Sequence, residues 1–253
     1  MASGRILFWF AAAHLAVAVV ALIALAFAAP PIGGVHPALK PLKFAISIAV
    51  FLGTLALLVP ALSLSPTVRD VLAWIFALAM AGEMVAIAIQ ALRGTSSHYN
   101  FRPGLDATIS MTMALLVVAA TLAMIGVAIV ATIRPLVDCD ALRATAWRAG
   151  LWFFLLAAGT GFRMIGNMRH SVGGADGGPG LPVTSWSTAH GDLRVSHFIA
   201  LHALQILPLA SVAIAALPLG PAARWSVLLG VIVAYAAVAV GTLVQALAGR
   251  PLW

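Results

Sequence analysis

Charged side chains are scarce in this chain. Asp, Glu, Lys and Arg make up 8% of its 253 residues, and Glu83 is the only glutamate. An average soluble domain is about one quarter charged, so the composition excludes an ordinary soluble protein. Hydrophobic residues make up 63% of the chain, and its mean hydropathy is +1.09. Several apolar runs are long enough to cross a hydrocarbon core of about 30 Å, which predicts a polytopic α-helical membrane protein.

Other absences narrow the class further. Cysteine occurs once, at Cys139, which excludes an internal disulfide and a cysteine-based metal cluster. The alternation of apolar and polar residues that is typical of transmembrane barrels is absent. The net charge of +7 reflects few acidic residues, and Lys and Arg are scattered singly at the ends of apolar runs. Such charges anchor helices at lipid headgroups, and they do not indicate nucleic-acid binding.

Seven membrane spans are predicted. They cover approximately residues 6–29, 43–63, 71–93, 108–133, 148–167, 196–217 and 225–247. The first apolar run is too long for a typical signal peptide, so we expect it to be retained as a span. Seven spans in a chain of this length also suggest a retinal protein. The last span contains no lysine that could form a Schiff base with retinal, so this class is excluded. The whole chain, 1–253, is therefore expected to form a single integral membrane domain.

The two sides of the membrane differ in their polar residues. An odd number of spans places the termini on opposite sides, here named side A (N-terminal) and side B (C-terminal). Six Lys and Arg residues belong to side A and eight to side B, so the positive-inside rule does not decide the orientation. Several of the side-B cations are candidate site residues, and when these are left out of the count we favour side A as cytoplasmic. Most of the histidines, both lysines and the long polar loops belong to side B. We expect side B to be the working face of a protein of the bacterial cytoplasmic membrane.

A search for repeats predicts an internal duplication. His36–Phe44 aligns with His190–Phe198 at an offset of 154 residues. Ile89–Gly94 aligns with Val244–Gly249 at an offset of 155, as does Pro66 with Pro221. Three matches in order at nearly one offset predict two parallel copies of three helices, about 5–94 and 148–250, joined by a linker helix at about 108–133. A parallel-repeat plan of this kind is found among membrane transporters.

Glu83 is the first candidate site residue because it falls near the middle of a span. A carboxyl group at that depth must be neutral, paired or open to an aqueous cavity. Gln90 lies seven residues further on, so both side chains occupy one helix face. We expect Glu83 to carry protons or bind a ligand, although a protonated side chain that bonds a neighbouring helix is the structural alternative.

Three histidines within spans are the candidate metal or haem ligands. His197 and His202 are five residues apart, a spacing that does not place them on one helix face as a chelating pair. Each of them, or His14 in the first span, would need ligands from other helices. No firm metal site follows, and hydrogen-bonding histidines in a polar, histidine-rich pocket are the simpler interpretation.

The predicted pocket opens on side B and binds a small molecule. Its cations attract a carboxylate, a phosphate or a lipid headgroup. The complete set of candidate ligand-binding residues is Lys40, Lys43, Glu83, Gln90, His98, Arg163, Asn167, Arg194, His197, His202, Gln205 and Gln245.

Two function classes remain open. The first is a transporter or binding protein for a small solute, anionic and proton-linked, with the lipid bilayer and a small-molecule ligand as its partners. The second is a membrane-embedded haem- or metal-dependent enzyme that acts on a lipid or a quinone. Its ligands would be His14, His197 and His202. Catalytic residues are not identified, and a homo-oligomer is left open.

Overall fold

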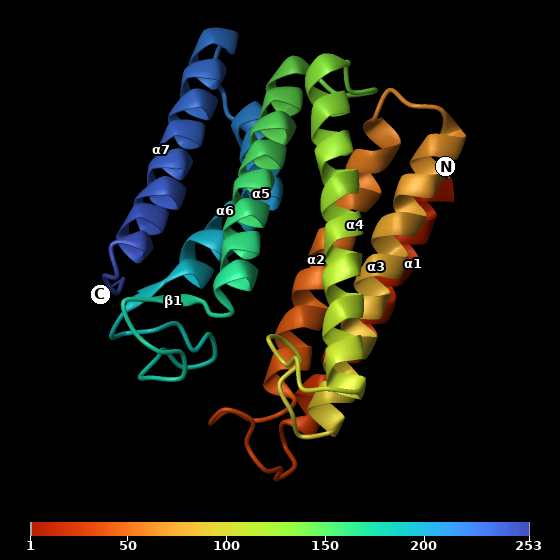
Figure 1. Cartoon of the computed structure of the whole chain (residues 1–253). Coiled ribbons are helices and arrows are strands. Elements are labelled where there is room, and N and C mark those ends of the chain that lie inside the picture. The colour runs from red at the N-terminus through yellow and green to blue at the C-terminus, as the bar shows by residue number, and fades with distance from the viewer. Residues whose placement is uncertain (1, 253) are drawn as a thin grey trace. The chain divides into compact units, whose positions relative to one another are not determined.

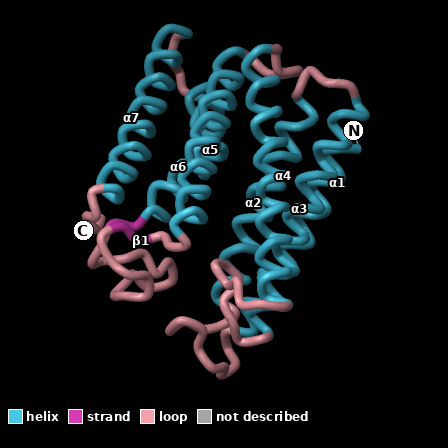
Figure 2. The backbone as a smooth tube through the Cα atoms, viewed as in Figure 1, coloured by secondary structure: helices cyan, strands magenta, loops and turns pink. Residues whose placement is uncertain are grey.

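The computed structural model describes residues 2–252 and is built from long helices (Figures 1 and 2). The helices are α1 (Ala2–Ala24), α2 (Leu39–Ala61), α3 (Pro66–Leu92), α4 (Leu105–Ile133), α5 (Ala141–Asn167), α6 (Leu193–Ala216) and α7 (Pro221–Leu247). All seven are long and apolar enough to span a membrane. The prediction of an all-α membrane protein with seven transmembrane helices is confirmed.

Most helices begin several residues before the apolar run that predicted them, because capping residues lie upstream of the run. Ser65, Asp140 and Asp192 each accept a hydrogen bond from a backbone N–H of the first turn of α3, α5 and α6. Such caps satisfy backbone donors that lack intrahelical partners. Pro66 and Pro221 occupy the first position of α3 and α7, where proline needs no N–H.

The first helix is displaced from its predicted position. It covers residues 2–24 rather than 6–29, and a turn follows it. Pro30 and Pro31 lie just beyond that turn, and the subsequent loop is closed by a bridge between Ile32 and Val35. Gly33 and Gly34 supply the positive φ angles of this turn.

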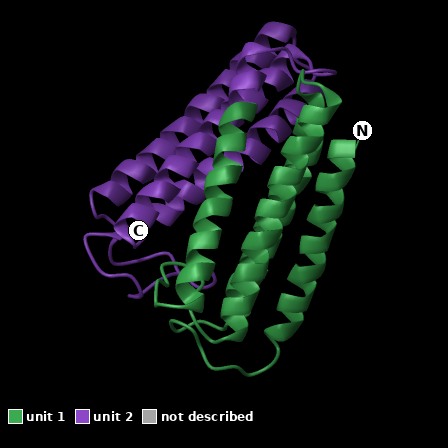
Figure 3. Cartoon of the chain, turned by 45° about the vertical axis from the view of Figure 1, so that its right-hand side comes forward, with its two compact units in different colours: residues 1–127 green, residues 128–253 purple. Residues whose placement is uncertain are grey.

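The chain divides into two compact units, residues 1–127 and 128–253 (Figure 3). In the first unit α1 packs along α2 and also contacts α3. In the second unit α5 packs along α6, and α6 also packs against α7. The boundary falls within α4, whose last turns are tied to α5. There, Arg148 Nε donates to the carbonyl of Ala131, and Trp152 Nε1 donates to Thr132 Oγ1.

Glycine permits the closest helix contacts. A Cβ atom at Gly150 of α5 would lie 2.8 Å from the Ala203 carbonyl oxygen of α6. At Gly4 of α1, a Cβ would lie 3.2 Å from the Ala56 carbonyl oxygen of α2. Small residues at helix contacts let backbones approach closely, which favours packing within a membrane.

The long loop between α5 and α6 folds against the start of α6. Its only regular structure within the described residues is a two-stranded antiparallel ribbon of β1 (Ser171–Val172) and β2 (Gly191–Asp192). A Cβ atom at Gly191 would lie 2.1 Å from the Ala246 carbonyl oxygen, so this position has no room for a side chain. The loop is thereby held against the end of α7 near the C-terminus (Figure 2).

The turns of the α2–α3 and α6–α7 hairpins have the same hydrogen bonds. Leu62 N–H donates to the Val59 carbonyl and Leu64 N–H to that of Leu62. The second hairpin repeats these bonds 155 residues later, from Leu217 to Ile214 and from Leu219 to Leu217.

The ends of α3 and α7 also match. Gly94 and Gly249 each have a positive φ, and the residue after each one donates to a glutamine carbonyl, Gln90 or Gln245. Both ends therefore form the same glycine-closed Schellman motif. These matches agree with the offset in the sequence, and the internal repeat itself stays a prediction.

Candidate functional site

A partly buried polar cluster in the first unit contains three predicted site residues. Lys40, at the start of α2, places its Nζ 3.2 Å from Nδ1 of His98, which comes from the loop after α3. Ser97 Oγ lies 3.1 Å from the same nitrogen. The Lys40 ammonium also lies 5.8 Å from the centre of the Phe44 ring. The lysine charge is thus held between an imidazole and an aromatic face, a geometry that stabilises a cation.

Glu83 is the third member of this cluster. Its side chain is only 4% exposed, and one carboxyl oxygen is buried with no hydrogen-bond partner among the described residues. Lys40 lies close enough to act on this carboxyl group electrostatically. Buried polar atoms are normally hydrogen-bonded, so the unpartnered oxygen is an exception that keeps Glu83 a candidate site residue.

His98 is neutral over the physiological pH range. Burial, and then the nearby charge of Lys40, lower the pKa of His98 from 6.5 to about 3. An uncharged imidazole accepts a hydrogen bond at one nitrogen and donates at the other. Because Lys40 has only donors, Nδ1 of His98 is the acceptor and Nε2 carries the proton.

Gln90 belongs to a separate structural network. Its Nε2 donates to Asp106 Oδ1 at 3.1 Å, and its Oε1 accepts from Arg93 Nη1 at 2.6 Å. Arg93 also forms an ion pair with Asp106, and the Asn100 side chain hydrogen-bonds the same carboxylate. Both polar ends of Gln90 are therefore engaged in holding the α3–α4 loop. The sequence predicted Gln90 as a ligand-binding residue because it shares a helix face with Glu83, and that role stays a prediction.

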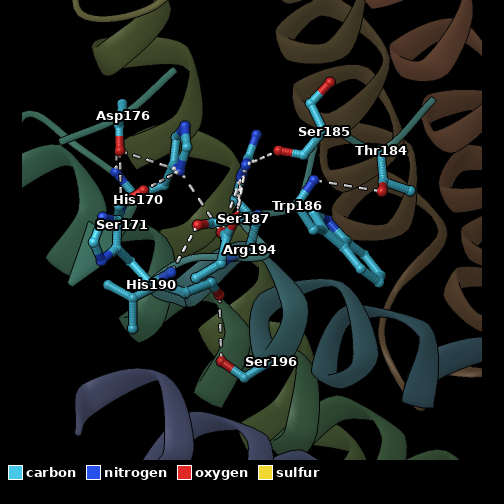
Figure 4. Close-up of polar contacts among 12 residues, drawn as sticks. His170, Ser171, Asp176, Thr184, Ser185, Trp186, Ser187, His190, Arg194 and Ser196 are labelled. Atoms are coloured by element: carbon cyan, nitrogen blue, oxygen red, sulfur yellow. Dashed lines mark hydrogen bonds and ion pairs between the residues drawn. The ribbon is translucent and has the colours of Figure 1, made fainter. Parts of the chain in front are cut away.

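A second polar cluster lies where the α5–α6 loop meets the start of α6 (Figure 4). Asp192 accepts hydrogen bonds from the backbone N–H of Ser187 at 2.8 Å and from that of Arg194 at 3.0 Å. The Arg194 guanidinium forms an ion pair with the same carboxylate at 2.6 Å, and it also donates to the Ser185 carbonyl. The positive charge of Arg194 is thus neutralised within the protein.

His170 lies between two carboxylates of this cluster. Its Nδ1 is 3.3 Å from Asp176 and 3.7 Å from Asp192. Burial raises the pKa of each aspartate, but hydrogen bonds outweigh this effect and hold both pKa values below 3.8. The main donors are Ser171 for Asp176 and Arg194 for Asp192. The loop is therefore fixed by ionised carboxylates.

The three histidines within spans share one hydrogen-bonding arrangement. Nδ1 of His14 contacts the Phe10 carbonyl at 2.7 Å, that of His197 the Ala157 carbonyl at 2.7 Å, and that of His202 the Phe198 carbonyl at 2.8 Å. A carbonyl oxygen only accepts, so Nδ1 carries the proton in each ring. In the neutral imidazole, Nε2 then presents a lone pair to a hydroxyl group or a metal ion.

An apolar groove lies between α6 and α7. Its volume is about 500 Å³, and it is lined by Phe198, Ile199, His202, Ile206, Val231, Ala234, Tyr235 and Val238. The His202 ring stacks on Phe198 with 4.0 Å between ring centres, and Trp186 of the α5–α6 loop meets the same phenylalanine edge-on at 5.6 Å. His202 is the only strongly polar side chain in this lining, since the Tyr235 hydroxyl donates to the Ile199 carbonyl.

The remaining candidates are dispersed. Arg163 and Asn167 are exposed on the last turns of α5, whereas Lys43, Gln205 and Gln245 are partly buried on α2, α6 and α7. Gln245 donates to the carbonyl of Pro251, and this hydrogen bond holds the C-terminal residues against the end of α7. Binding roles for these five residues stay predictions.

No group of three or more His, Cys, Asp or Glu side chains with the geometry of a metal site occurs within residues 2–252. Comparison with family models, with curated proteins and with solved structures gives no match. The arrangement of side chains is therefore the only guide to function.

Sequence reasoning overlooked several residues that build these sites. Trp186 and Tyr235 contribute to the apolar groove or its rim, and Ser187 supplies a backbone donor to Asp192. The aromatic residues carried no signal because they resemble ordinary span and loop residues. Ser187 could not be predicted from its side chain, since it contributes a backbone N–H.

Proposed function

We propose that this integral membrane protein is a proton-linked transporter of a small anionic solute. The observation that supports the proposal is the buried Glu83 carboxyl, which has an unpartnered oxygen and lies within electrostatic reach of Lys40. Isolated charges are costly at this depth, so a carboxylate and an ammonium stabilise each other there. The protein contains the two elements that proton coupling requires, an acid that exchanges a proton and a cation that attracts the solute.

In the proposed cycle the proton and the solute act on the same lysine. When Glu83 is ionised, its negative charge is balanced by Lys40. Protonation of Glu83 forms a neutral carboxylic acid, so the carboxylate or phosphate of a solute replaces the ionised Glu83 as the negative charge beside Lys40. Neutral His98 holds the ammonium in place without adding a second positive charge. Binding of the proton and binding of the anion therefore favour each other.

The test is a transport assay in proteoliposomes that carry an inward proton gradient. Uptake into the vesicles is measured with radiolabelled acetate, pyruvate, succinate, citrate and inorganic phosphate, because coupling one proton to one monovalent anion moves no net charge. At least one anion is expected to show saturable uptake that depends on the gradient. The substitution Glu83→Gln keeps the size of the side chain but removes the titrating proton, so it should abolish the dependence of uptake on pH.

A matched control separates this effect from general damage. Asp138→Asn removes a carboxylate that is exposed on side A, and asparagine tolerates the positive φ of this position. Its uptake rates should equal those of the unmodified protein. The proposal is wrong if no anion of the panel shows saturable, gradient-dependent uptake, or if uptake by Glu83→Gln retains the full pH dependence.

A membrane-embedded haem- or metal-dependent enzyme is the second candidate. The observation in its favour is the hydrogen-bonding pattern that His14, His197 and His202 have in common, in which Nδ1 donates to a carbonyl and Nε2 keeps its lone pair. Metal-ligating histidines usually donate their other ring N–H in this manner. Absorption spectra and metal analysis of the purified protein test it. A Soret band or stoichiometric metal that is lost in His202→Leu would support the enzyme, and a colourless, metal-free preparation would contradict it.

We also propose the bacterial cytoplasmic membrane as its location, with the N-terminus in the cytoplasm. The support is limited to the basic residues that remain when the candidate site residues Lys40, Lys43, Arg163 and Arg194 are left out of the count, since side A then carries six and side B four. Reporter fusions after Arg134 and after Arg250 test the orientation. A cytoplasmic reporter should be active in the first fusion and inactive in the second.

A further inference from the structure

The α6–α7 groove has the size and lining of a small-molecule site rather than of a helix-packing surface. Ligand pockets commonly enclose about 300–1,000 Å³ and combine apolar walls with a few polar groups. The groove falls within this range at about 500 Å³. It lies wholly within the second unit and does not include Glu83 or Lys40, so an occupant there would be distinct from the proposed transported solute.

The polar contact in this groove has a defined character. The Nδ1–H group of His202 donates to the Phe198 carbonyl, and an imidazole with one proton then presents only a hydrogen-bond acceptor at Nε2. The Tyr235 hydroxyl is already engaged with the Ile199 carbonyl. An occupant that makes a polar contact here must therefore supply a hydroxyl or N–H donor.

The depth of His202 limits the occupant further. His202 lies nine residues after Leu193, the first residue of α6, which is about 14 Å along a helix that rises 1.5 Å per residue. Charged phospholipid headgroups remain at the membrane surface, so they do not reach this level. The donor must belong to an uncharged molecule that is soluble in the hydrocarbon region.

The aromatic side chains favour a ring at this position. The Phe198 ring packs against that of His202 at a tilt of 32° and makes an edge contact with Trp186, while Tyr235 contributes from α7. Flat aromatic surfaces are best covered by another ring in an offset or edge-to-face geometry. Further along the groove, Ile206 and Val231 supply only aliphatic surface, which suits a hydrocarbon chain.

We propose that the α6–α7 groove binds a quinol, which is a hydroxylated aromatic ring with an apolar chain. One quinol hydroxyl donates to Nε2 of His202, the ring lies against Phe198 and Tyr235, and the chain follows the aliphatic part of the groove. The reduced form is preferred because it has the hydroxyl donors that the neutral imidazole requires. The oxidised quinone has only acceptor oxygens and forms no hydrogen bond there.

Equilibrium binding of tritium-labelled decylubiquinol to the full-length protein in lipid nanodiscs tests this proposal under anaerobic conditions at neutral pH. Saturable binding with one site per chain is expected. The 1,4-dimethyl ether of decylubiquinol has the same ring and chain but no donor. It should compete about tenfold less effectively, the ratio that corresponds to one lost hydrogen bond of about 1.4 kcal/mol.

Substitutions in α6 and α7, the two helices that line the groove, test where the ligand binds. His202→Leu removes the acceptor and should weaken quinol binding about tenfold while leaving the affinity of the dimethyl ether unchanged. Val238→Trp fills the groove from α7 and should abolish saturable binding. Val240→Trp places the same bulk on an exposed position of α7 outside the groove lining and should bind normally.

Several results would overturn the proposal. Equal affinity for the quinol and its dimethyl ether would show that the groove holds only an apolar chain, such as a lipid tail. Normal binding in Val238→Trp would place the ligand elsewhere. Absence of saturable binding in the unmodified protein would exclude a quinol site. None of these results affects the proton-linked transport proposal, which is tested at Glu83 in the other unit.

Discussion

Lys40 and His98, which are 58 residues apart in the chain, meet through a hydrogen bond of 3.2 Å between Nζ and Nδ1. This contact requires a neutral imidazole. The pKa of His98 falls from 6.5 to about 3 in the folded protein because of burial and of the Lys40 charge. Between these two pH values the unfolded chain binds a proton that the folded chain does not, so stability must decrease as the pH falls.

We therefore predict that the protein is fully stable above pH 6.5 and loses stability progressively towards pH 3. Thermal unfolding in detergent, followed by circular dichroism at a series of pH values, measures this loss. His98→Asn removes the titrating ring and should flatten the profile between these pH values. An unchanged slope in this variant would assign the acid sensitivity to other groups.

The Asp192–Arg194 pair should be required for the fold of the α5–α6 loop. Asp192→Ala leaves a partly buried guanidinium and two backbone N–H groups without their acceptor, which typically costs about 3–5 kcal/mol. We expect a clear decrease in Tm and faster proteolysis within residues 173–190. The matched comparison is the exposed ion pair of Asp140 and Arg143, where Arg143→Ala should change stability by less than about 1 kcal/mol.

Two glycines on α5 should respond in opposite directions to the same substitution. At Gly150 an added methyl group meets the Ala203 carbonyl oxygen at 2.8 Å, so Gly150→Ala should force α5 and α6 apart and lower Tm. At Gly159 no atom lies within 4 Å of the added Cβ, so Gly159→Ala should raise stability by up to about 1 kcal/mol through helix propensity. Equal responses would contradict the close α5–α6 contact.

The glycines that end α3 and α7 should be equally sensitive. Gly94 has a φ of 67° and Gly249 a φ of 71°, a conformation that costs a residue with a Cβ about 1–2 kcal/mol. Gly94→Ala and Gly249→Ala should each destabilise the protein by this amount, whereas the corresponding asparagine variants should lose less. Unequal losses would argue against equivalent turns in the two hairpins.

The seven helices could be predicted because long apolar runs identify membrane spans without knowledge of tertiary contacts. The first residue of each helix was harder to predict, because helix ends are determined by local hydrogen bonds. Thus α5 begins at Ala141, seven residues before the predicted span, since Asp140 caps it. The displaced end of α1 has a different origin, because its last apolar residues precede two prolines.

Candidate site residues could be identified by type, but not by partner. Glu83 and His98 were recognisable as polar groups within or beside spans, and their common relation to Lys40 depends on how the loop after α3 folds. Arg194 shows the same limit. Its charge was predicted to attract anions, a role that stays a prediction, and the structure pairs this charge with the adjacent Asp192. A neighbour in the sequence was visible, but the loop conformation that directs the two side chains together was not.

The matching turns of the two hairpins give position 83 a counterpart 155 residues later, at Val238. One member of this pair is the buried acid of the first unit, and the other is a wall of the apolar groove. Under the predicted repeat, an ancestral three-helix module retained its backbone in both copies while the side chains at one shared location diverged. The same helix position then serves a buried acid in one unit and the wall of an apolar groove in the other, so one backbone plan accommodates two different chemical environments.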